Sequence, residues 1–184
     1  MALLGTQGSR GLSHPRVDRH AGVPAGTTSF YFRTRKALLL AIGNRITELD
    51  VADLSLMAEL GHDEAGGYSG TLGLAQLVML SGTEPYLTRT RARFEIVLSA
   101  RQDPELDETF RNYGIRFYAL ARDVIAQWYD DPDVPDSVIE ERAVTVLTFI
   151  SGVMTSFVNG YSVVSDAAHL DRLIRQILQS SDLA

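Results

Sequence analysis

Apolar residues recur along most of this chain with the period of an amphipathic α-helix. Strong helical runs extend over about residues 34–60, 84–101, 105–130, 136–164 and 167–180. In the last run, apolar residues mark one face at the i, i+3, i+4, i+7 and i+8 spacing: Leu170, Leu173, Ile174, Ile177 and Leu178. No segment alternates convincingly between apolar and polar residues as a half-buried strand would. The pattern therefore predicts an all-α protein.

The sequence also marks several helix boundaries. Thr34 and Asp136 stand where N-cap residues are expected, and DPEL at 103–106 indicates the end of one helix and the start of the next. The motif DDPDVPD, which ends at Asp136, contains two prolines and predicts a turn. Five glycines fall within residues 61–73, so we expect a flexible loop there.

An uncharged stretch of 23 residues, from Ala143 to Ser165, is long enough to span a bilayer. We reject a membrane span because the stretch contains seven Ser or Thr residues and is preceded by EER rather than by a basic anchor. Gly152, Ser156 and Gly160 recur every four residues and make one helix face nearly flat. We interpret this face as part of a subunit interface, and the alternative is burial within a single chain.

The predicted homodimer interface joins this helix to the run at 167–180. Its members are Ile150, Gly152, Val153, Ser156, Phe157, Gly160, Leu170, Leu173, Ile174, Ile177 and Leu178.

A helix-turn-helix layout is visible in SHPRVDRHAGVPAGTTSFYF. Ser13 can cap the first helix, Pro15 is tolerated in its first turn, and Gly22 stands where a left-handed C-terminal residue is wanted. Pro24 then opens a second short helix, AGTTSFYF. We expect Val23 to fill the gap between the two helices and the final Phe of the motif to face inward.

The start of this second helix has the features of a DNA-contacting surface. Gly26 allows a close backbone approach, Thr27 and Ser29 are small hydroxyl donors, and free N–H groups there favour a phosphate. Arg35 and Lys36 lie in the first turn of the following helix, where positive charge opposes the helix dipole unless an anion lies in front of it. These features together predict the DNA backbone as the partner.

Charge is divided unevenly along the chain, whose net charge is −6. Residues 1–47 contain seven Arg or Lys and one acid, Asp18, whereas residues 48–184 contain ten Arg and 22 acids. Residues 1–47, which we call the head, therefore carry a net charge of +6, and the rest of the chain, the body, carries −12. This division indicates that only the head binds a polyanion.

The motif GVPAGTTSFYFRTRKALL resembles the signature of the TetR family of transcriptional regulators. The matching positions are Gly22, Val23, Gly26, Thr27, Tyr31, Phe32, Thr34 in place of Ser, Arg35 in place of Lys, and Leu38. The upstream GSRGLSHPRVDRHAGV is similar to the first helix of that family's helix-turn-helix, and the resemblance covers about residues 3–45. It implies a helix-turn-helix domain at 1–46 and a helical effector-binding and dimerisation domain at 47–184.

The resemblance also implies roles for particular residues. Ser13 and His14 would meet the DNA backbone, and Tyr31 and Arg35 would hold phosphates. The residues facing the major groove would be Ala25, Gly26, Thr27, Ser29 and Phe30.

Two departures from the family pattern change this expectation. Ser29 replaces the usual tyrosine and Ala25 a commonly polar residue, so Arg16, Arg33 or DNA shape must supply part of the base readout. The family has a full helix of about 15 residues before the LLGTQG motif, whereas only MALLG stands here, so we expect a truncated first helix.

The sequence contains no set of residues with the spacing of a known catalytic or metal-binding motif. The four histidines, His14, His20, His62 and His169, form no i, i+4 pair, and the chain has no cysteine. Nucleophile-elbow, phosphate-loop and dinucleotide motifs are also missing. We therefore expect no enzyme activity, no cofactor and no metal.

The resemblance raises the hypothesis of an effector cavity among the body helices, and the alternative is that its candidate residues are ordinary core or surface residues. The candidates are Met57, Met79, Arg91, Phe94, Glu95, Asn112, Tyr113, Phe117, Tyr118, Trp128, Phe149 and Phe157.

The sequence predicts a cytoplasmic, ligand-responsive DNA-binding repressor that acts as a homodimer on a near-palindromic operator. Its recognition helices would lie about 34–36 Å apart in successive major grooves. The chain has no cysteine and no visible signal peptide, and both observations fit a location in the cytoplasm. The alternative is a helical dimer that binds a small molecule or a protein but no DNA, because its supporting first helix is missing.

Overall fold

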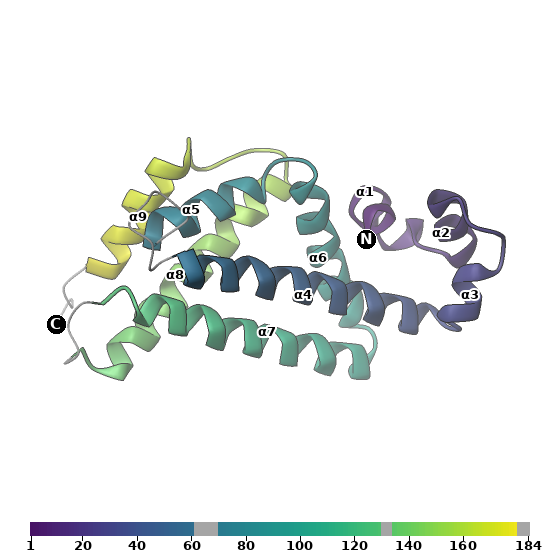
Figure 1. Cartoon of the computed structure of the whole chain (residues 1–184), viewed down its shortest axis with the longest axis horizontal. Helices are drawn as coiled ribbons and strands as arrows, with labels where there is room; N and C mark the ends of the chain where they lie inside the picture. The colour runs from purple at the N-terminus through teal and green to yellow at the C-terminus, as the bar shows by residue number, and fades with distance from the viewer. Residues whose placement is uncertain (61–69, 130–133, 180–184) are drawn as a thin grey trace. The chain divides into compact units, whose positions relative to one another are not determined.

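The computed structural model describes residues 1–60, 70–129 and 134–179, and every regular element in these ranges is an α-helix. This confirms the predicted all-α fold. In chain order the helices are α1 (Ala2–Gly11), α2 (His14–Ala21), α3 (Thr27–Tyr31), α4 (Arg35–Leu60), α5 (Gly70–Leu80), α6 (Tyr86–Ala100), α7 (Pro104–Ala126), α8 (Asp136–Val158) and α9 (Ala167–Gln179) (Figure 1).

The chain divides into two compact units. The first contains Met1–Leu49 and Glu84–Gly114, and the second contains Asp50–Thr83 and Ile115–Ala184. Helices α4 and α7 each contribute to both units. The predicted domain boundary after residue 46 falls within α4 and stays a prediction.

The first unit is built around the packing of α1 against α6, with α2 contacting both α1 and α3. Phe32 packs against its apolar core, which confirms that this ring faces inward. The buried core residues are Leu3, Leu4, Leu12, Leu38, Leu39, Ile42, Ile46, Ala92, Ile96, Ala100 and Leu106.

The second unit is formed by α5, α8 and α9, which contact one another, together with the second part of α7. Arg122 on α7 forms ion pairs with Asp136 at 2.9 Å and Glu140 at 3.4 Å on α8. The buried apolar residues of this unit are Ala75, Val78, Ala121, Ile125, Ile139, Ala143, Val146, Ile150, Val153, Phe157, Val164, Leu170 and Ile174.

Several predicted helix boundaries agree with the structure. The Thr34 hydroxyl accepts the Ala37 N–H at 3.0 Å, which is the expected N-cap bond of α4. Asp103 accepts the N–H groups of Glu105 and Leu106 at 3.1 and 3.2 Å, so the chain restarts as a helix where DPEL predicted it. Asp136 is the first residue of α8 rather than its cap, which is Pro135.

Two predicted boundaries are wrong. Helix α8 ends at Val158 instead of continuing to residue 164, because Gly160 turns the chain at a φ of 85°. Residues 70–73 are the start of α5 rather than part of a loop, while residues 61–69 lie outside the described residues. Gly73 and Ala75 are buried in α5, which contacts α9, so packing outweighs the low helix propensity of glycine.

Among the described helices, α8 alone is long and apolar enough, by length and composition, to cross a membrane. The mean hydropathy of its most apolar window is 1.2, and its buried face packs against α5 and α9 as that of a core helix does.

Candidate nucleic-acid interface

The turn between α2 and α3 depends on two glycines with positive φ. Gly22 ends α2 at a φ of 66°, and Gly26 precedes α3 at a φ of 93°. A Cβ at either position would meet nothing within 4 Å, so the backbone conformation rather than crowding requires glycine. The predicted glycine turn is confirmed.

Asp18 on α2 fixes the start of α3. Its side chain is 3% exposed, and its carboxylate accepts the N–H groups of Gly26 and Thr28, both at 2.8 Å. The Thr28 hydroxyl donates to the same carboxylate at 2.5 Å, and this bond is the largest cause that lowers the pKa of Asp18.

These contacts overturn one prediction, because the N–H groups of Gly26 and Thr28 are not free for a phosphate. Sequence reasoning also missed Asp18 as a functional residue. The available signal was its position as the single acid among residues 1–47.

The outward face of α3 carries two aromatic rings. Phe30 is 77% and Tyr31 72% exposed, and the rings meet edge to face with centroids 5.2 Å apart. Thr28, two residues before Phe30, is buried on the side away from that ring. The exposed residues of this surface, which we call the α3 face, are Ala25, Gly26, Ser29, Phe30 and Tyr31.

Two residues near this face differ from expectation. The Thr27 hydroxyl donates to the Pro24 carbonyl at 2.7 Å, so its hydrogen is already used within the chain. Val23 is 38% exposed and does not fill the gap between α2 and α3 as expected.

Unpaired positive charge flanks the α3 face. Arg19 on α2 and Arg33, two residues after α3, are exposed, and neither has an ion-pair partner within the described parts of the chain. Arg16 is exposed too, and donates to the Gln7 side chain at 3.3 Å. Part of the positive charge predicted for the head is therefore exposed on α2 and just after α3.

His14 and Arg35 are held by backbone carbonyl groups. The His14 ring donates from Nε2 to the Phe32 carbonyl at 2.5 Å, and the Arg35 guanidinium donates to the carbonyls of Ser9 and Leu12. His14 therefore joins the start of α2 to the end of α3, and Arg35 joins the start of α4 to the chain around the end of α1. A phosphate contact by Arg35 stays a prediction that would use its remaining donors, since a guanidinium has five N–H groups. Ser13, the N-cap of α2, makes no side-chain capping bond.

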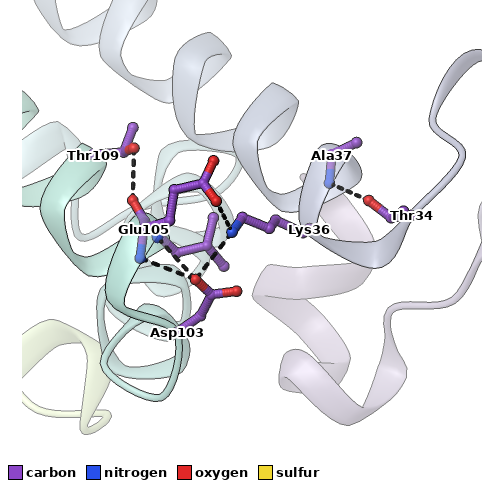
Figure 2. Close-up of polar contacts among 7 residues, drawn as sticks. Thr34, Lys36, Ala37, Asp103, Glu105 and Thr109 are labelled. Carbon is purple, nitrogen blue, oxygen red and sulfur yellow. Dashed lines mark hydrogen bonds and ion pairs between the residues drawn. The ribbon is translucent and has the colours of Figure 1, made fainter.

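Lys36, a predicted DNA contact, is ion-paired within the chain. Its ammonium forms ion pairs with Asp103 at 3.1 Å and with Glu105, at the start of α7 (Figure 2). The bond to Glu105 is the largest cause that raises the pKa of Lys36. These ion pairs join the first turn of α4 to α7, and the DNA contact of Lys36 stays a prediction.

The polar residues predicted for an effector cavity are engaged elsewhere in the first unit. Glu95 accepts the Ser9 N–H at 2.9 Å and so joins α6 to α1. Arg91 forms an ion pair with Glu84 at 3.3 Å, and the Tyr113 hydroxyl donates to Asn44. Arg91 and Glu95 are therefore already bonded within the chain, whereas the candidate Asn112 stays a prediction.

The remaining cavity candidates stay a prediction. Met79, Trp128 and Phe149 are half-buried in the second unit, and Phe94 is half-buried in the first. The side chains of Met57 and Phe117 lie outside the described ones.

The structure corrects the predicted dimer interface. Six of its members are buried inside the second unit, and they cannot also face a second subunit: Ile150, Val153, Ser156, Phe157, Leu170 and Ile174. The Ser156 hydroxyl donates to the Val153 carbonyl at 2.7 Å, which satisfies it within α8. Gly152 and Gly160 are exposed, and Leu173, Ile177 and Leu178 are half-buried.

The carboxyl-terminal part of the sequence matches a family model. Residues 70–180 match the model described as tetracyclin repressor-like, C-terminal domain, which covers more than half of the chain. The chain belongs to the TetR family of transcriptional regulators.

Solved TetR-family structures share this fold over nearly the whole chain. A putative TetR-family regulator from Rhodococcus sp. superposes with a TM-score of 0.71 at 21% identity, covering 97% of this chain and 93% of that one. A TetR-family member from Streptomyces coelicolor A3 superposes with a TM-score of 0.70 at 18% identity, covering 97% and 92%. The multidrug binding protein EbrR, solved with imidazole, gives 0.62 at 19% identity, covering 98% and 91%. No curated protein matches the chain in sequence.

Membership of the TetR family confirms the resemblance drawn from residues 3–45, although the matching model covers a different part of the chain. At these identities the structural likeness shows the fold alone. The contacts of α3, Asp18 and the flanking arginines therefore carry the functional argument.

Proposed function

We propose that this TetR-family protein is a ligand-responsive DNA-binding repressor that acts as a homodimer on a near-palindromic operator. The α3 face would enter the major groove, and Arg19 and Arg33 would contact phosphates on either side. Double-stranded DNA, an effector and a second subunit are its proposed partners.

One observation carries the proposal. The exposed α3 face follows a turn held by Asp18, and two exposed arginines, on α2 and just after α3, have no ion-pair partner in the described residues. A rigid helix with positive flanks is the arrangement that places side chains in a DNA groove and neutralises the phosphates around it. The acidic remainder of the chain would repel DNA and so restrict binding to the head.

The dimer is proposed through an exposed stripe of α8. Val144, Thr148, Ser151, Gly152 and Thr155 are exposed, uncharged and follow one another at helical spacing. Small side chains allow a second helix to approach closely, and an uncharged face loses little hydration energy when it is covered. A dimer would place two α3 faces on one duplex. An effector that binds better to a conformation with another spacing of the two heads would shift the protein toward that conformation and away from DNA.

The alternative, a helical dimer that binds no DNA, rested on a missing support for the helix-turn-helix. In the structure α1 contacts α2 and supplies Leu3 and Leu4 to the core of the first unit, and Leu12, directly after α1, joins them. This observation favours the DNA-binding function over the alternative.

The test is an electrophoretic shift with the duplex flanking the protein's own gene and with a random duplex library. We expect binding that weakens steeply with salt. Arg33→Ala should weaken it for all sequences and reduce the slope of log K against log salt by about 1 per subunit, because one phosphate contact is lost.

Arg45→Ala is the matched control. It removes the same charge from an exposed position on α4 that is ion-paired with Glu48 at 3.0 Å, so affinity and salt slope should stay close to those of the unsubstituted protein. Absence of binding to any duplex at low salt would overturn the proposed function and favour the alternative.

A further inference from the structure

The α3 face is short of hydrogen-bond donors for base edges. Ala25 and Gly26 have no polar side chain, the Thr27 hydroxyl donates to Pro24, and the Thr28 hydroxyl donates to Asp18. The hydroxyls that remain on this face are those of Ser29 and of Tyr31, which the resemblance assigns to a phosphate. Readout of bases by hydrogen bonds from α3 is therefore restricted to very few groups.

The same face exposes an unusual amount of apolar surface. Phe30 is the most exposed large hydrophobic residue in the described parts of the chain, at 77%. Water opposes the exposure of such a ring, and an exposed apolar surface of this kind usually marks a contact site. The ring is also held in place, because it packs edge to face on Tyr31 and the start of α3 is fixed by Asp18.

The position of Phe30 directs the ring away from the protein. It lies two residues after the buried Thr28, and a turn of about 200° along a helix of 3.6 residues places it on the opposite side. It also lies four residues after Gly26, whose N–H is bound by Asp18 and whose Cα has open space around it. The open space at Gly26 leaves room on this side of α3 for the ring to reach the floor of a groove.

The charge around Phe30 indicates which kind of partner covers it. Arg19 and Arg33 are exposed and lack ion-pair partners among the described residues, so the site favours a polyanion. The apolar group that duplex DNA presents in its major groove is the C5 methyl group of thymine.

We propose that Phe30 contacts the C5 methyl group of a thymine in each half-site, so that operator recognition depends on this methyl group. The inference rests on the proposed DNA-binding function and adds to it the base feature that is read. Specificity at this position then comes from apolar burial rather than from a hydrogen bond.

The experiment compares thymine with deoxyuridine, which has the same hydrogen-bonding groups but no methyl group. Duplexes are first selected from a random library with the full-length protein. The tightest binders are then resynthesised with deoxyuridine in place of one thymine at a time, and affinities are measured by fluorescence anisotropy. We expect a loss of roughly fourfold for one methyl group and roughly 15-fold when both half-sites are changed, as the burial of one carbon-sized apolar group implies.

Phe30→Ala should bind thymine and deoxyuridine duplexes equally, because the contacting ring is gone. The substitution removes a side chain that is 77% exposed, so the fold should be retained, and a thermal melt checks this. Tyr31→Phe is the matched control. It keeps the neighbouring ring and removes one hydroxyl, so overall affinity falls if that hydroxyl meets a phosphate, while the thymine-to-deoxyuridine ratio stays as in the unsubstituted protein.

Two results would overturn the inference without affecting the proposed function. One is tight, salt-sensitive binding of selected duplexes with no loss at any deoxyuridine position. The other is a full thymine preference that persists in Phe30→Ala. If no duplex is bound at all, the proposed function itself fails, and the inference fails with it.

Discussion

Asp18 joins the two helices of the helix-turn-helix through a single carboxylate. It receives two N–H groups and one hydroxyl from the start of α3. These donors stabilise the charged form and lower the pKa of Asp18, with the Thr28 hydroxyl as the largest cause. An acid in the most basic part of the chain is thus explained by its position between helices.

A depressed pKa makes this contribution to stability dependent on pH. Because the folded-state pKa of Asp18 lies below its unfolded value of about 3.9, the contribution is fully present above that value. It is lost as the pH falls through the lower folded-state pKa. The relevant window therefore lies on the acid side of about pH 4.

Asp18→Asn should lower the melting temperature by several degrees at neutral pH. The substitution replaces one carboxylate oxygen by an NH₂ group, which would face an N–H or O–H donor of α3 instead of accepting from it. The difference from the unsubstituted protein should close as the pH falls through the folded-state pKa. Thr28→Val should raise the pKa of Asp18, observable by NMR titration. Circular-dichroism melts between pH 7 and the acid limit, at roughly half-unit steps, provide the first test.

Glu108→Gln is the control, because it removes one negative charge from an exposed position of α7. Equal melting temperatures of the Asp18→Asn and Glu108→Gln proteins at neutral pH would contradict the assigned role of Asp18.

At the scale of elements, the packing of α1 on α6 involves a backbone contact. A Cβ added at Gly5 would lie 2.1 Å from the Thr88 carbonyl oxygen, far inside van der Waals contact. Glu95 on α6 binds the Ser9 N–H a little further along α1. Helix α6 therefore holds the head through both steric fit and a hydrogen bond.

Gly5→Ala should reduce the free energy of unfolding by about 1–3 kcal/mol, because α1 must move away from α6. Gly114→Ala, within α7, should instead raise it by about 0.5–1 kcal/mol, since a Cβ there meets nothing within 4 Å and helical alanine is favoured over glycine. Urea unfolding at equal protein concentration measures both. Similar effects of the two substitutions would contradict the close contact at Gly5.

At the scale of the whole molecule, the proposed function requires two chains on one duplex. The buried face of α8 is already used within the chain, which leaves the exposed uncharged stripe around Gly152 for a partner. This stripe shares Gly152 with the predicted interface, which also included buried residues of α8 and residues of α9.

Gly152→Arg should convert the proposed dimer into a monomer, because a charged side chain would be placed in the middle of the stripe. A Cβ at Gly152 meets nothing within 4 Å, so the fold of the single chain should persist. Sedimentation velocity gives the mass, and DNA affinity should fall together with dimerisation. Gly114→Arg makes the same exchange at another open helix position and should leave the mass unchanged. A Gly152→Arg protein that keeps the mass of a dimer would exclude this stripe as the interface.

Much of the fold and part of the candidate site could be predicted from sequence. The period of apolar residues located most helices, the glycines at 22 and 26 located the turn, and the charge count located the basic head. Each of these properties is local, because helix periodicity and positive φ depend on neighbours within a few residues. The motif around Thr27 and Tyr31 also indicated the TetR family, because its residues lie close together in the sequence.

The tertiary structure decided which partner each of these side chains has. Lys36 meets Asp103 and Glu105, which are 67 and 69 positions away, and Glu95 meets Ser9 across 86 positions. It also decided which face of α8 is buried and that residues 70–80 form a helix. No local pattern encodes such pairings, since they depend on how distant helices pack, and packing can neutralise a charge or cover an apolar face that the sequence alone leaves free.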